Sequence, residues 1–262
     1  MFANLRQLPR YRGLIQSLVA RDVKARYRGS ILGFFWSFFN PLLLLLVYTF
    51  VFSYVMPPPA NIPNYALFLF CGLLPWTWFS ASLIESSNVL ISGGNLIKKV
   101  MFPAEILPIV TVLSHLVHFL FGLPILVAFL VYFRAPLQAS ELAWFPVVVL
   151  VQLLMSVGFA LILSALTVHF RDIKDILVNV MTLWFFATPI IYRWDNPPPQ
   201  IRRFLNLNPF SHIAISYQEI LYFDGPFGNA RWILALGIGS VLLFLFGYFL
   251  FDRLRDSFAE EV

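Results

Sequence analysis

Six long apolar segments, separated by shorter polar connections, run through this 262-residue chain and restrict the folds open to it. They span about residues 31–55, 65–92, 105–133, 142–168, 176–192 and 232–251. A helix needs roughly 20 apolar residues to cross about 30 Å of hydrocarbon, and most of these segments reach that length. Composition agrees, because 60% of the residues are hydrophobic and only 12% are charged, against about 25% charged in soluble domains. The sequence therefore predicts an all-α membrane protein with six transmembrane helices.

The first thirty residues are basic rather than apolar. Helical phasing gathers an apolar face opposite a basic one, which is typical of a helix lying along a membrane surface. The apolar face consists of Ile15, Leu18, Val19 and Val23. We expect residues 1–30 to form a cytoplasmic amphipathic interface helix and residues 31–262 to form the transmembrane domain. The interface residues that we predict are Arg21, Lys24, Arg26, Tyr27 and Arg28.

The distribution of basic residues predicts the orientation. With the N-terminus inside, thirteen of the 18 Lys and Arg residues lie on the cytoplasmic side and five lie outside. Short cytoplasmic loops carry such an excess of Lys and Arg, so both termini are predicted to be cytoplasmic. Since these cations gather at the membrane edges, the net charge of +5 does not indicate a nucleic-acid partner.

One connection, residues 193–229, is much longer than a loop between neighbouring helices requires. It contains many apolar side chains and is interrupted by prolines, among them Pro209. Non-helical backbone at membrane depth is tolerated only inside protein or beside a cavity. We therefore expect a re-entrant segment of two short helices around Asn208-Pro209, on the outer side and before the last transmembrane helix.

Motifs for enzymatic chemistry are weak in this sequence. The phosphate-binding pattern G-x-x-x-x-G-K-[ST] does not occur, so we expect no nucleotide hydrolysis by this chain. With the single cysteine Cys71, no intrachain disulfide is expected. His115 and His118 are one helical turn apart, but the sequence favours interior polar residues over a metal site. Asp172 and Asp175 are read as salt-bridged residues at a helix start rather than magnesium ligands, and no cofactor is expected.

Glu85 is a carboxylate inside an apolar segment, and intramembrane charges are candidate functional residues. Two interpretations stay open: Glu85 pairs with a basic residue at the interface or faces water near that end of the helix, or it faces a wet translocation path. Several aromatic residues lie beside helix breakers or polar residues, where flat rings can stack on sugar faces. Together with Glu85, they are the predicted path residues: Trp36, Tyr48, Trp76, Trp78 and Trp184.

An ordered series of short motifs covers nearly the whole chain. It comprises Arg26-Tyr27-Arg28, Leu32-Gly33 with Trp36, Asn40-Pro41, Gly72-Leu73-Leu74-Pro75-Trp76, Phe102-Pro103 with Glu105, Phe170-Arg171-Asp172-Ile173, Thr188-Pro189-Ile190-Ile191-Tyr192 and Asn208-Pro209. In this order the motifs resemble the membrane subunit of polysaccharide ABC exporters of the ABC-2 type, the group that exports O-antigen, capsule and teichoic acid chains.

The resemblance implies a homodimer in the cytoplasmic (inner) membrane of a bacterium, joined to two ABC ATPase subunits that bind ATP and Mg²⁺. The substrate would be a lipid-linked polysaccharide. The outer segment would then act as a gate, with Asn208, Pro209, Tyr217, Gln218 and Tyr222 as its candidate residues. Residues expected to transmit ATPase motion are Lys98, Lys99, Met101, Phe102, Pro103, Glu105, Arg171 and Asp172. Arg171 and Asp172 are also predicted to form a structural ion pair.

Two alternatives remain beside this interpretation. One is an ABC-2 exporter of a small drug or lipid, with the same loops and fewer aromatic residues along the path. The other is a membrane enzyme that transfers sugar phosphate to a polyprenyl carrier, in which Asp172 and Asp175 would hold magnesium.

Overall fold

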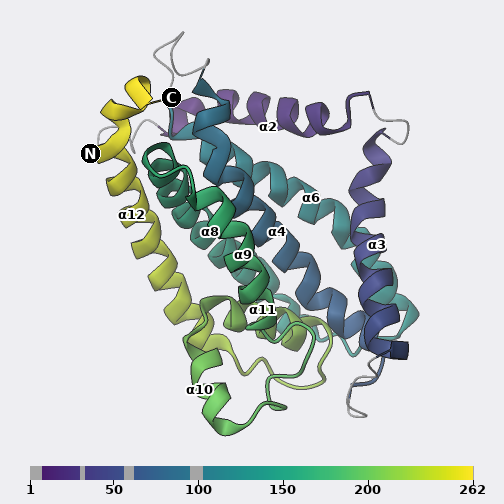
Figure 1. The fold of residues 1–262 in the computed structure, drawn as a ribbon. Helices are drawn as coiled ribbons and strands as arrows, with labels where there is room; N and C mark the ends of the chain where they lie inside the picture. The colour runs from purple at the N-terminus through teal and green to yellow at the C-terminus, as the bar shows by residue number, and fades with distance from the viewer. Residues whose placement is uncertain (1–7, 30–32, 56–61, 95–102, 262) are drawn as a thin grey trace.

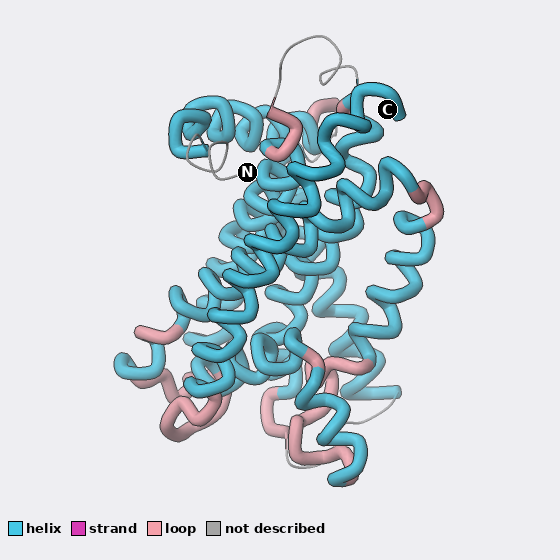
Figure 2. The backbone as a smooth tube through the Cα atoms, turned by 90° about the vertical axis from the view of Figure 1, so that its left-hand side faces the viewer, coloured by secondary structure: helices cyan, strands magenta, loops and turns pink. Residues whose placement is uncertain are grey.

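The computed structural model describes residues 8–29, 33–55, 62–94 and 103–261, and the regular structure within them is helical (Figures 1 and 2). The α-helices are α2 (Arg12–Tyr27), α3 (Trp36–Phe50), α4 (Tyr65–Ser92), α6 (Ile106–Tyr132), α7 (Ala139–Leu142), α8 (Phe145–His169), α9 (Ile173–Phe186), α10 (Pro199–Leu207), α11 (Pro209–Leu221) and α12 (Ala230–Glu261). Short 3₁₀ turns at Leu8–Tyr11 and Gly33–Phe35 precede α2 and α3, and a π-helical turn at Val51–Val55 follows α3.

Four helical stretches are long and apolar enough to cross a membrane: Tyr65–Ser92, Ile106–Tyr132, Ala139–His169 and Ala230–Arg255. Two shorter helices, α3 and α9, run in the same bundle between the same two ends (Figure 1). The chain is therefore a multi-pass membrane protein. The described parts of α2 and α12 place the beginning and the end of the chain at one end of the bundle, opposite α10 and α11 (Figures 1 and 2).

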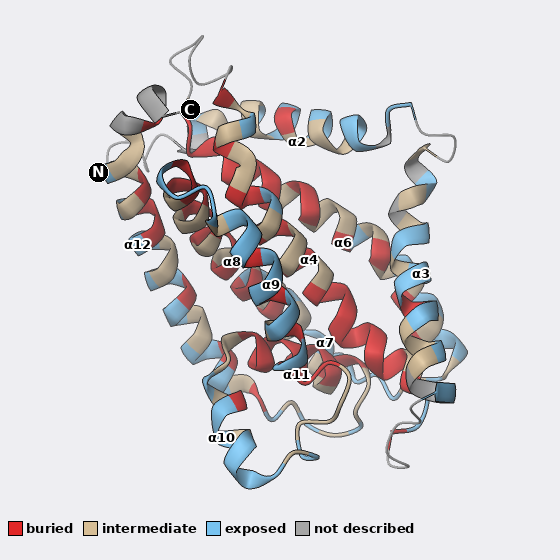
Figure 3. Cartoon of the chain, viewed as in Figure 1, coloured by how far each residue is buried: buried red, intermediate tan, exposed pale blue. Residues whose placement is uncertain are grey.

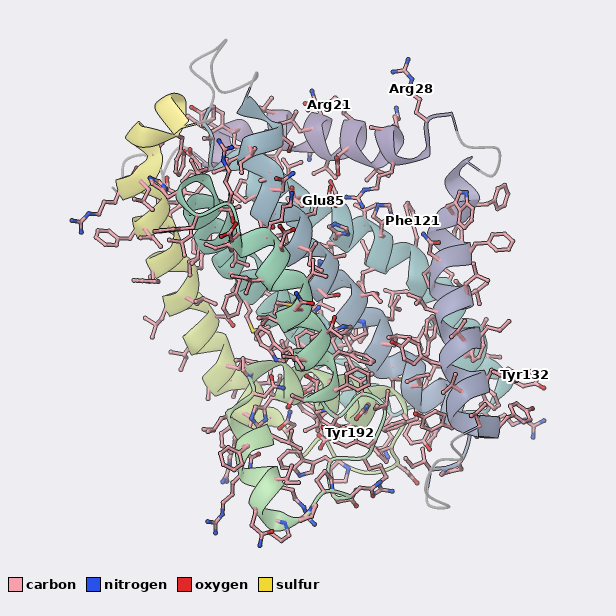
Figure 4. All side chains as sticks on the ribbon, viewed as in Figure 1. Arg21, Arg28, Glu85, Phe121, Tyr132 and Tyr192 are labelled. Atoms are coloured by element: carbon pink, nitrogen blue, oxygen red, sulfur yellow. The ribbon has the colours of Figure 1, made fainter. Side chains whose placement is uncertain are left out.

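Helix α2 lies across the end of the bundle rather than along it (Figure 1). Leu18 is its most enclosed residue, and it packs against Ile106 and Val110 in the first turns of α6. Arg21 and Arg28 point away from the bundle on the far side of α2 (Figure 4). The apolar face predicted from helical phasing therefore is the face that contacts the bundle, because only that face removes apolar area from water.

The core is centred on α4, whose residues are mostly buried, whereas α12 exposes much of its apolar surface (Figure 3). Buried side chains of α4 pack with those of α6, α8, α9 and α11 into one cluster. Exposed leucines and phenylalanines on the outer helices are expected where lipid replaces water as the solvent. α4 is therefore the helix around which the others are arranged.

Helices α8 and α12 pack side by side through glycine. A Cβ added at Gly247 would lie 2.6 Å from the carbonyl oxygen of Gly158, and one added at Gly158 would lie 2.9 Å from Cγ of Leu243. Small residues permit such close backbone approach, which is the usual basis of tight helix association in membranes. This contact fixes α12, which has few other neighbours in the protomer.

The helix limits predicted from sequence agree closely for α4 and α6 and less well for the last two helices of the bundle. α9 covers residues 173–186 instead of 176–192, because the chain leaves helical geometry at Ala187, just before Thr188-Pro189. A residue before proline disfavours helical backbone, so the helix ends early. α12 continues past residue 251 to Glu261, because polar residues are compatible with a helix that extends beyond the hydrocarbon. In this extension Nη1 of Arg255 lies 3.7 Å from Oδ1 of Asp252, one turn earlier.

Candidate functional site

A cluster of ionisable side chains joins α2, α4 and α6 near the end of the bundle that α2 crosses. Nη2 of Arg26 donates to Oε2 of Glu85 at 2.6 Å, and Nε2 of His115 lies 2.8 Å from the same oxygen. Oδ2 of Asp22 lies 3.6 Å from Arg26, one turn back along α2. Glu85 extends from α4 toward α2 (Figure 4). Of the two interpretations left open by the sequence, pairing with a basic residue is the one observed in this conformation.

The cluster is partly exposed. The side chains of Arg26 and Glu85 are 29% and 43% exposed, whereas that of His115 is only 7% exposed. The carboxylate therefore lies between a cation that water can reach and a buried imidazole. Separating a half-buried pair of this kind leaves one charge uncompensated, and this cost opposes movement of the two helices apart.

A cavity of about 530 Å³ opens between α3, α4 and α6, next to this cluster. Its polar wall consists of Arg26, Asn40, Thr77, His115 and His118, and its apolar wall includes Trp36, Leu44, Leu74, Trp78 and Phe119. An aromatic wall facing a polar one suits an amphiphilic or sugar-like ligand better than a purely apolar one. Two of the predicted path residues, Trp36 and Trp78, line this cavity.

Three of the other predicted path residues, Tyr48, Trp76 and Trp184, belong to an aromatic group between α3, α4, α9 and α11. Trp76 packs edge-to-face with Phe210 of α11 at a centroid distance of 5.0 Å, and with Trp184 of α9 at 6.5 Å. The ring of Tyr48 lies 5.6 Å from that of Phe185. Trp76 is buried, so these rings form part of the protein core. Within one protomer the six predicted path residues therefore do not line a common path.

Asn208 connects α9, α10 and α11 at the opposite end of the bundle. Its Oδ1 accepts hydrogen bonds from Nε1 of Trp184 at 2.7 Å and from the backbone N–H of Phe210 at 3.0 Å. Its Nδ2 donates to the carbonyl of Ala187 and to Oγ1 of Thr188, both at 3.0 Å. Asn208 is therefore the N-cap of α11, with Pro209 following at the favoured first helical position. The predicted two short helices around Asn208-Pro209 are present.

Tyr217 and Gln218, two of the candidate gate residues, lie inside the protein. Both are 1% exposed on α11, and Nε2 of Gln218 donates to the carbonyl of Pro189 at 2.9 Å. Tyr222 is half-buried and its hydroxyl donates to the carbonyl of Pro63. Burial raises the pKa of Tyr222 to about 12, so that hydroxyl keeps its proton. Tyr217 packs against Phe119 of α6 and Phe145 of α8, while Gln218 is held by the chain after α9, so both are enclosed in this conformation. Their part in a gate stays a prediction.

Comparison with known proteins identifies the family. The family model described as ABC-2 type transporter matches residues 13–222. The chain belongs to the ABC-2 type transporter family. It is 42% identical over 265 residues, covering all of both chains, to a Myxococcus xanthus protein named O-antigen export system permease protein RfbA. It is 34% identical over 247 residues, 94% of each chain, to a Klebsiella pneumoniae protein of the same name. An Escherichia coli polysialic acid transport protein, KpsM, is 22% identical over 204 residues, 76% of this chain and 78% of the relative.

Of the predicted coupling residues of this ABC-2 chain, Lys98, Lys99, Met101 and Phe102 lie outside the described residues, and so does the side chain of Tyr27 on α2. Pro103 and Glu105 lead into α6, and Glu105 is only 4% exposed. Because Glu105 is buried here, it could contact a partner subunit directly only in a different conformation. Lys24 and the other α2 cations that are described remain exposed.

Arg171 and Asp172 lie in the turn between α8 and α9, at the same end of the ABC-2 bundle as α2 (Figure 1). Both are exposed, and no ion pair joins them or links either to another described residue. The predicted structural ion pair was therefore wrong. Adjacent residues at the start of a helix point in different directions, so their side chains do not meet here.

His115 is buried, as the sequence predicted, but its pairing with Glu85 was not predicted. The signal was an ionisable side chain within the apolar segment 105–133, which is unusual in a membrane helix. Its partner Glu85 is 30 residues away on another helix, so helical spacing within one segment could not reveal the contact. Among the described residues, no group of three His, Cys, Asp or Glu side chains is arranged to hold a metal ion.

Proposed function

We propose that this chain is the membrane subunit of an ATP-driven exporter that moves a lipid-linked polysaccharide across the bacterial cytoplasmic membrane. The observation that carries this proposal is the 42% identity, over the full length of both chains, to a protein named as an O-antigen export permease. The more distant likeness to a polysialic acid transport protein points to the same substrate class. O-antigen, capsule and teichoic acid chains are the substrates within that class.

The proposed assembly contains two copies of this chain and two separate ATPase subunits that bind ATP and Mg²⁺. Two copies around a twofold axis would each contribute the same surfaces to one central path. The aromatic residues that are separated within one protomer would then meet their counterparts from the other copy. ATP binding would close the ATPase pair, and the loops between α4 and α6 and between α8 and α9 would transmit that motion.

The proposed topology has six crossings, made by α3, α4, α6, α8, α9 and α12, with both termini in the cytoplasm. α2 would lie on the cytoplasmic surface, and α10 and α11 would re-enter the outer leaflet. The apolar composition of α3 and the extensive burial of α11 support this arrangement. The ionic cluster of Arg26, Glu85 and His115 would then hold α2 over the cavity, and movement of α2 would open it.

The direct test deletes the gene for this chain in its own host and measures surface glycan and cytoplasmic lipid-linked glycan. We expect surface glycan to disappear, the lipid-linked form to accumulate inside, and the wild-type gene to reverse both effects. Unchanged surface glycan would reject polysaccharide export. The ABC-2 family also allows a small drug or lipid exporter; that reading predicts normal glycan together with drug or lipid retention. A purified chain that transferred sugar phosphate without an ATPase would instead support the enzyme alternative.

A further inference from the structure

A second hollow lies between α2 and α6, separate from the cavity beside Glu85. It has a volume of about 900 Å³, and none of its lining residues lines the other cavity. From α2 it is lined by Ile15, Val19 and Val23, and from α6 by Leu116, Val117 and Leu120. Leu120 is 47% exposed and the other five side chains are partly buried, so the groove is an apolar surface at the edge of the core.

Cations lie on the α2 side of this groove. Lys24, in the last turns of α2, and Arg28, the residue directly after the helix, both line it and are exposed. Neither forms an ion pair within the described chain. The acidic residues close to α2, Asp22 and Glu85, are both paired with Arg26. Within the part of the chain that the structure describes, the positive charge of Lys24 and Arg28 is therefore not compensated by a paired carboxylate.

An apolar groove with cations at one edge matches the two parts of an anionic phospholipid, the acyl chain and the charged headgroup. A hydrocarbon chain fills an apolar groove without leaving polar groups unsatisfied, and Lys and Arg at the membrane surface attract anionic headgroups. Long basic side chains can follow an apolar wall with their stems while the charged end stays at the headgroup level. The charged end of Arg28 lies beyond the end of α2, away from the bundle (Figure 4).

We propose that the groove between α2 and α6 binds an anionic phospholipid of the surrounding bilayer, with one acyl chain along α6 and the phosphate at Lys24 and Arg28. The inference uses the placement of α2 at the membrane surface that belongs to the proposed function. The lipid stabilises α2 against α6 from the outside, while the pairing of Arg26 with Glu85 holds the same helix from the cavity side. Lipid composition thereby acts on the helix that covers the cavity.

The test uses full-length protein in phosphatidylcholine vesicles that contain a small fraction of phosphatidylglycerol with a photoactivatable acyl chain. We expect saturable cross-links to peptides of α2 and to residues 113–120 of α6. Lys24→Gln should weaken the apparent affinity about fivefold and the double variant Lys24→Gln/Arg28→Gln about 25-fold, since each basic residue near the membrane surface contributes about fivefold. Arg21→Gln removes the same charge from the same helix outside the groove and should change the affinity less than about twofold.

Filling the groove with Val117→Trp should abolish the cross-links while leaving the folded protein able to bind its ATPase. Competition by unlabelled phosphatidylglycerol gives the affinity of the wild-type protein without any substitution. The proposal is overturned if a phosphatidylcholine probe cross-links equally well, or if polyprenyl phosphate displaces the probe at lower concentration than phosphatidylglycerol. Lipid cross-links confined to α9 or α12 would also overturn the proposal. So would cross-links between α2 or α6 of one copy and the second copy across the groove in place of lipid. Because no ATP or glycan is used, the outcome is independent of the export test.

Discussion

Nη2 of Arg26 lies 2.6 Å from Oε2 of Glu85, a contact between residues that are 59 positions apart in the chain. It joins α2, which crosses the end of the bundle, to α4, the helix at the centre of the core. Nε2 of His115, on α6, lies 2.8 Å from the same oxygen of Glu85. The proposed movement of α2 during transport must therefore break or carry along this pair.

Neutralising one partner of this pair should loosen α2. We expect Glu85→Gln and Arg26→Gln each to lower the free energy of unfolding by roughly 1–2 kcal/mol, less than for a fully buried pair because both side chains are partly exposed. The double variant should recover part of the loss, giving a coupling energy of at least about 0.5 kcal/mol. Thermal unfolding in detergent measures each value. Arg21→Gln is the matched control, and strictly additive single effects would contradict a direct interaction.

Removing the side chain of Asn208 should detach α10 and α11 from the end of α9. Asn208→Ala loses the N-cap of α11 and leaves Nε1 of Trp184 without its partner, which should lower the free energy of unfolding by about 2 kcal/mol. Asn208→Ser keeps a side-chain oxygen that can cap the backbone N–H of Phe210. Its free energy of unfolding should lie between those of the wild type and Asn208→Ala. Asn206→Ala, two residues earlier and on α10, is the control, since no described hydrogen bond uses the side chain of Asn206. Equal unfolding temperatures for the variants at 206 and 208 would argue against this role.

The close contact of α8 and α12 should not tolerate a methyl group. In Gly247→Ala the new Cβ would meet the backbone oxygen of Gly158 at 2.6 Å, which only separation of the helices relieves. We expect a loss of roughly 1–3 kcal/mol, as for other overpacked sites. Gly239→Ala on the same helix has no atom within 4 Å of the new Cβ and should be neutral or slightly stabilising. Unfolding of both variants in the same detergent gives the comparison.

Cysteine labelling tests whether α10 and α11 form a moving gate. In a Cys71→Ser background, Leu207→Cys should react readily with a membrane-impermeant thiol reagent from outside, because Leu207 is 80% exposed. Ser211→Cys should be protected at rest, because Ser211 is fully buried, and should react faster during turnover with ATP and substrate. Labelling of both positions that does not respond to nucleotide or substrate would reject a moving gate.

Arg171 and Asp172 are exposed, so substituting them should leave the fold intact. We expect Arg171→Ala and Asp172→Ala each to change the free energy of unfolding by no more than about 0.5 kcal/mol. If these residues contact the ATPase, the same variants should lower substrate-stimulated ATP hydrolysis and glycan export in proteoliposomes. Asn196→Ala, an exposed residue at the opposite end, is the control for surface substitution. Normal coupling in both variants would remove them from the coupling surface.

Local sequence determined much of this protein. Hydrophobicity selects lipid as the solvent and predicts helices at 65–92 and 105–133, which the structure has at Tyr65–Ser92 and Ile106–Tyr132. The division of the long connection 193–229 at Asn208-Pro209 also followed from sequence, because a capping residue followed by proline starts a helix. These properties depend on neighbours along the chain, and so does the series of motifs that marks the ABC-2 family.

Tertiary structure alone decided which of these helices' faces meet. The pairing of Glu85 with Arg26 and His115, the separation of Trp78 from Trp76, and the burial of Tyr217 depend on the rotation and depth of each helix relative to its neighbours. Residues that are two apart on a helix point in very different directions, so Trp76 faces Phe210 while Trp78 faces α6. An apolar segment sets no such rotation by its hydrophobicity, since lipid and protein interior are similarly apolar; the fit of side chains between helices sets it.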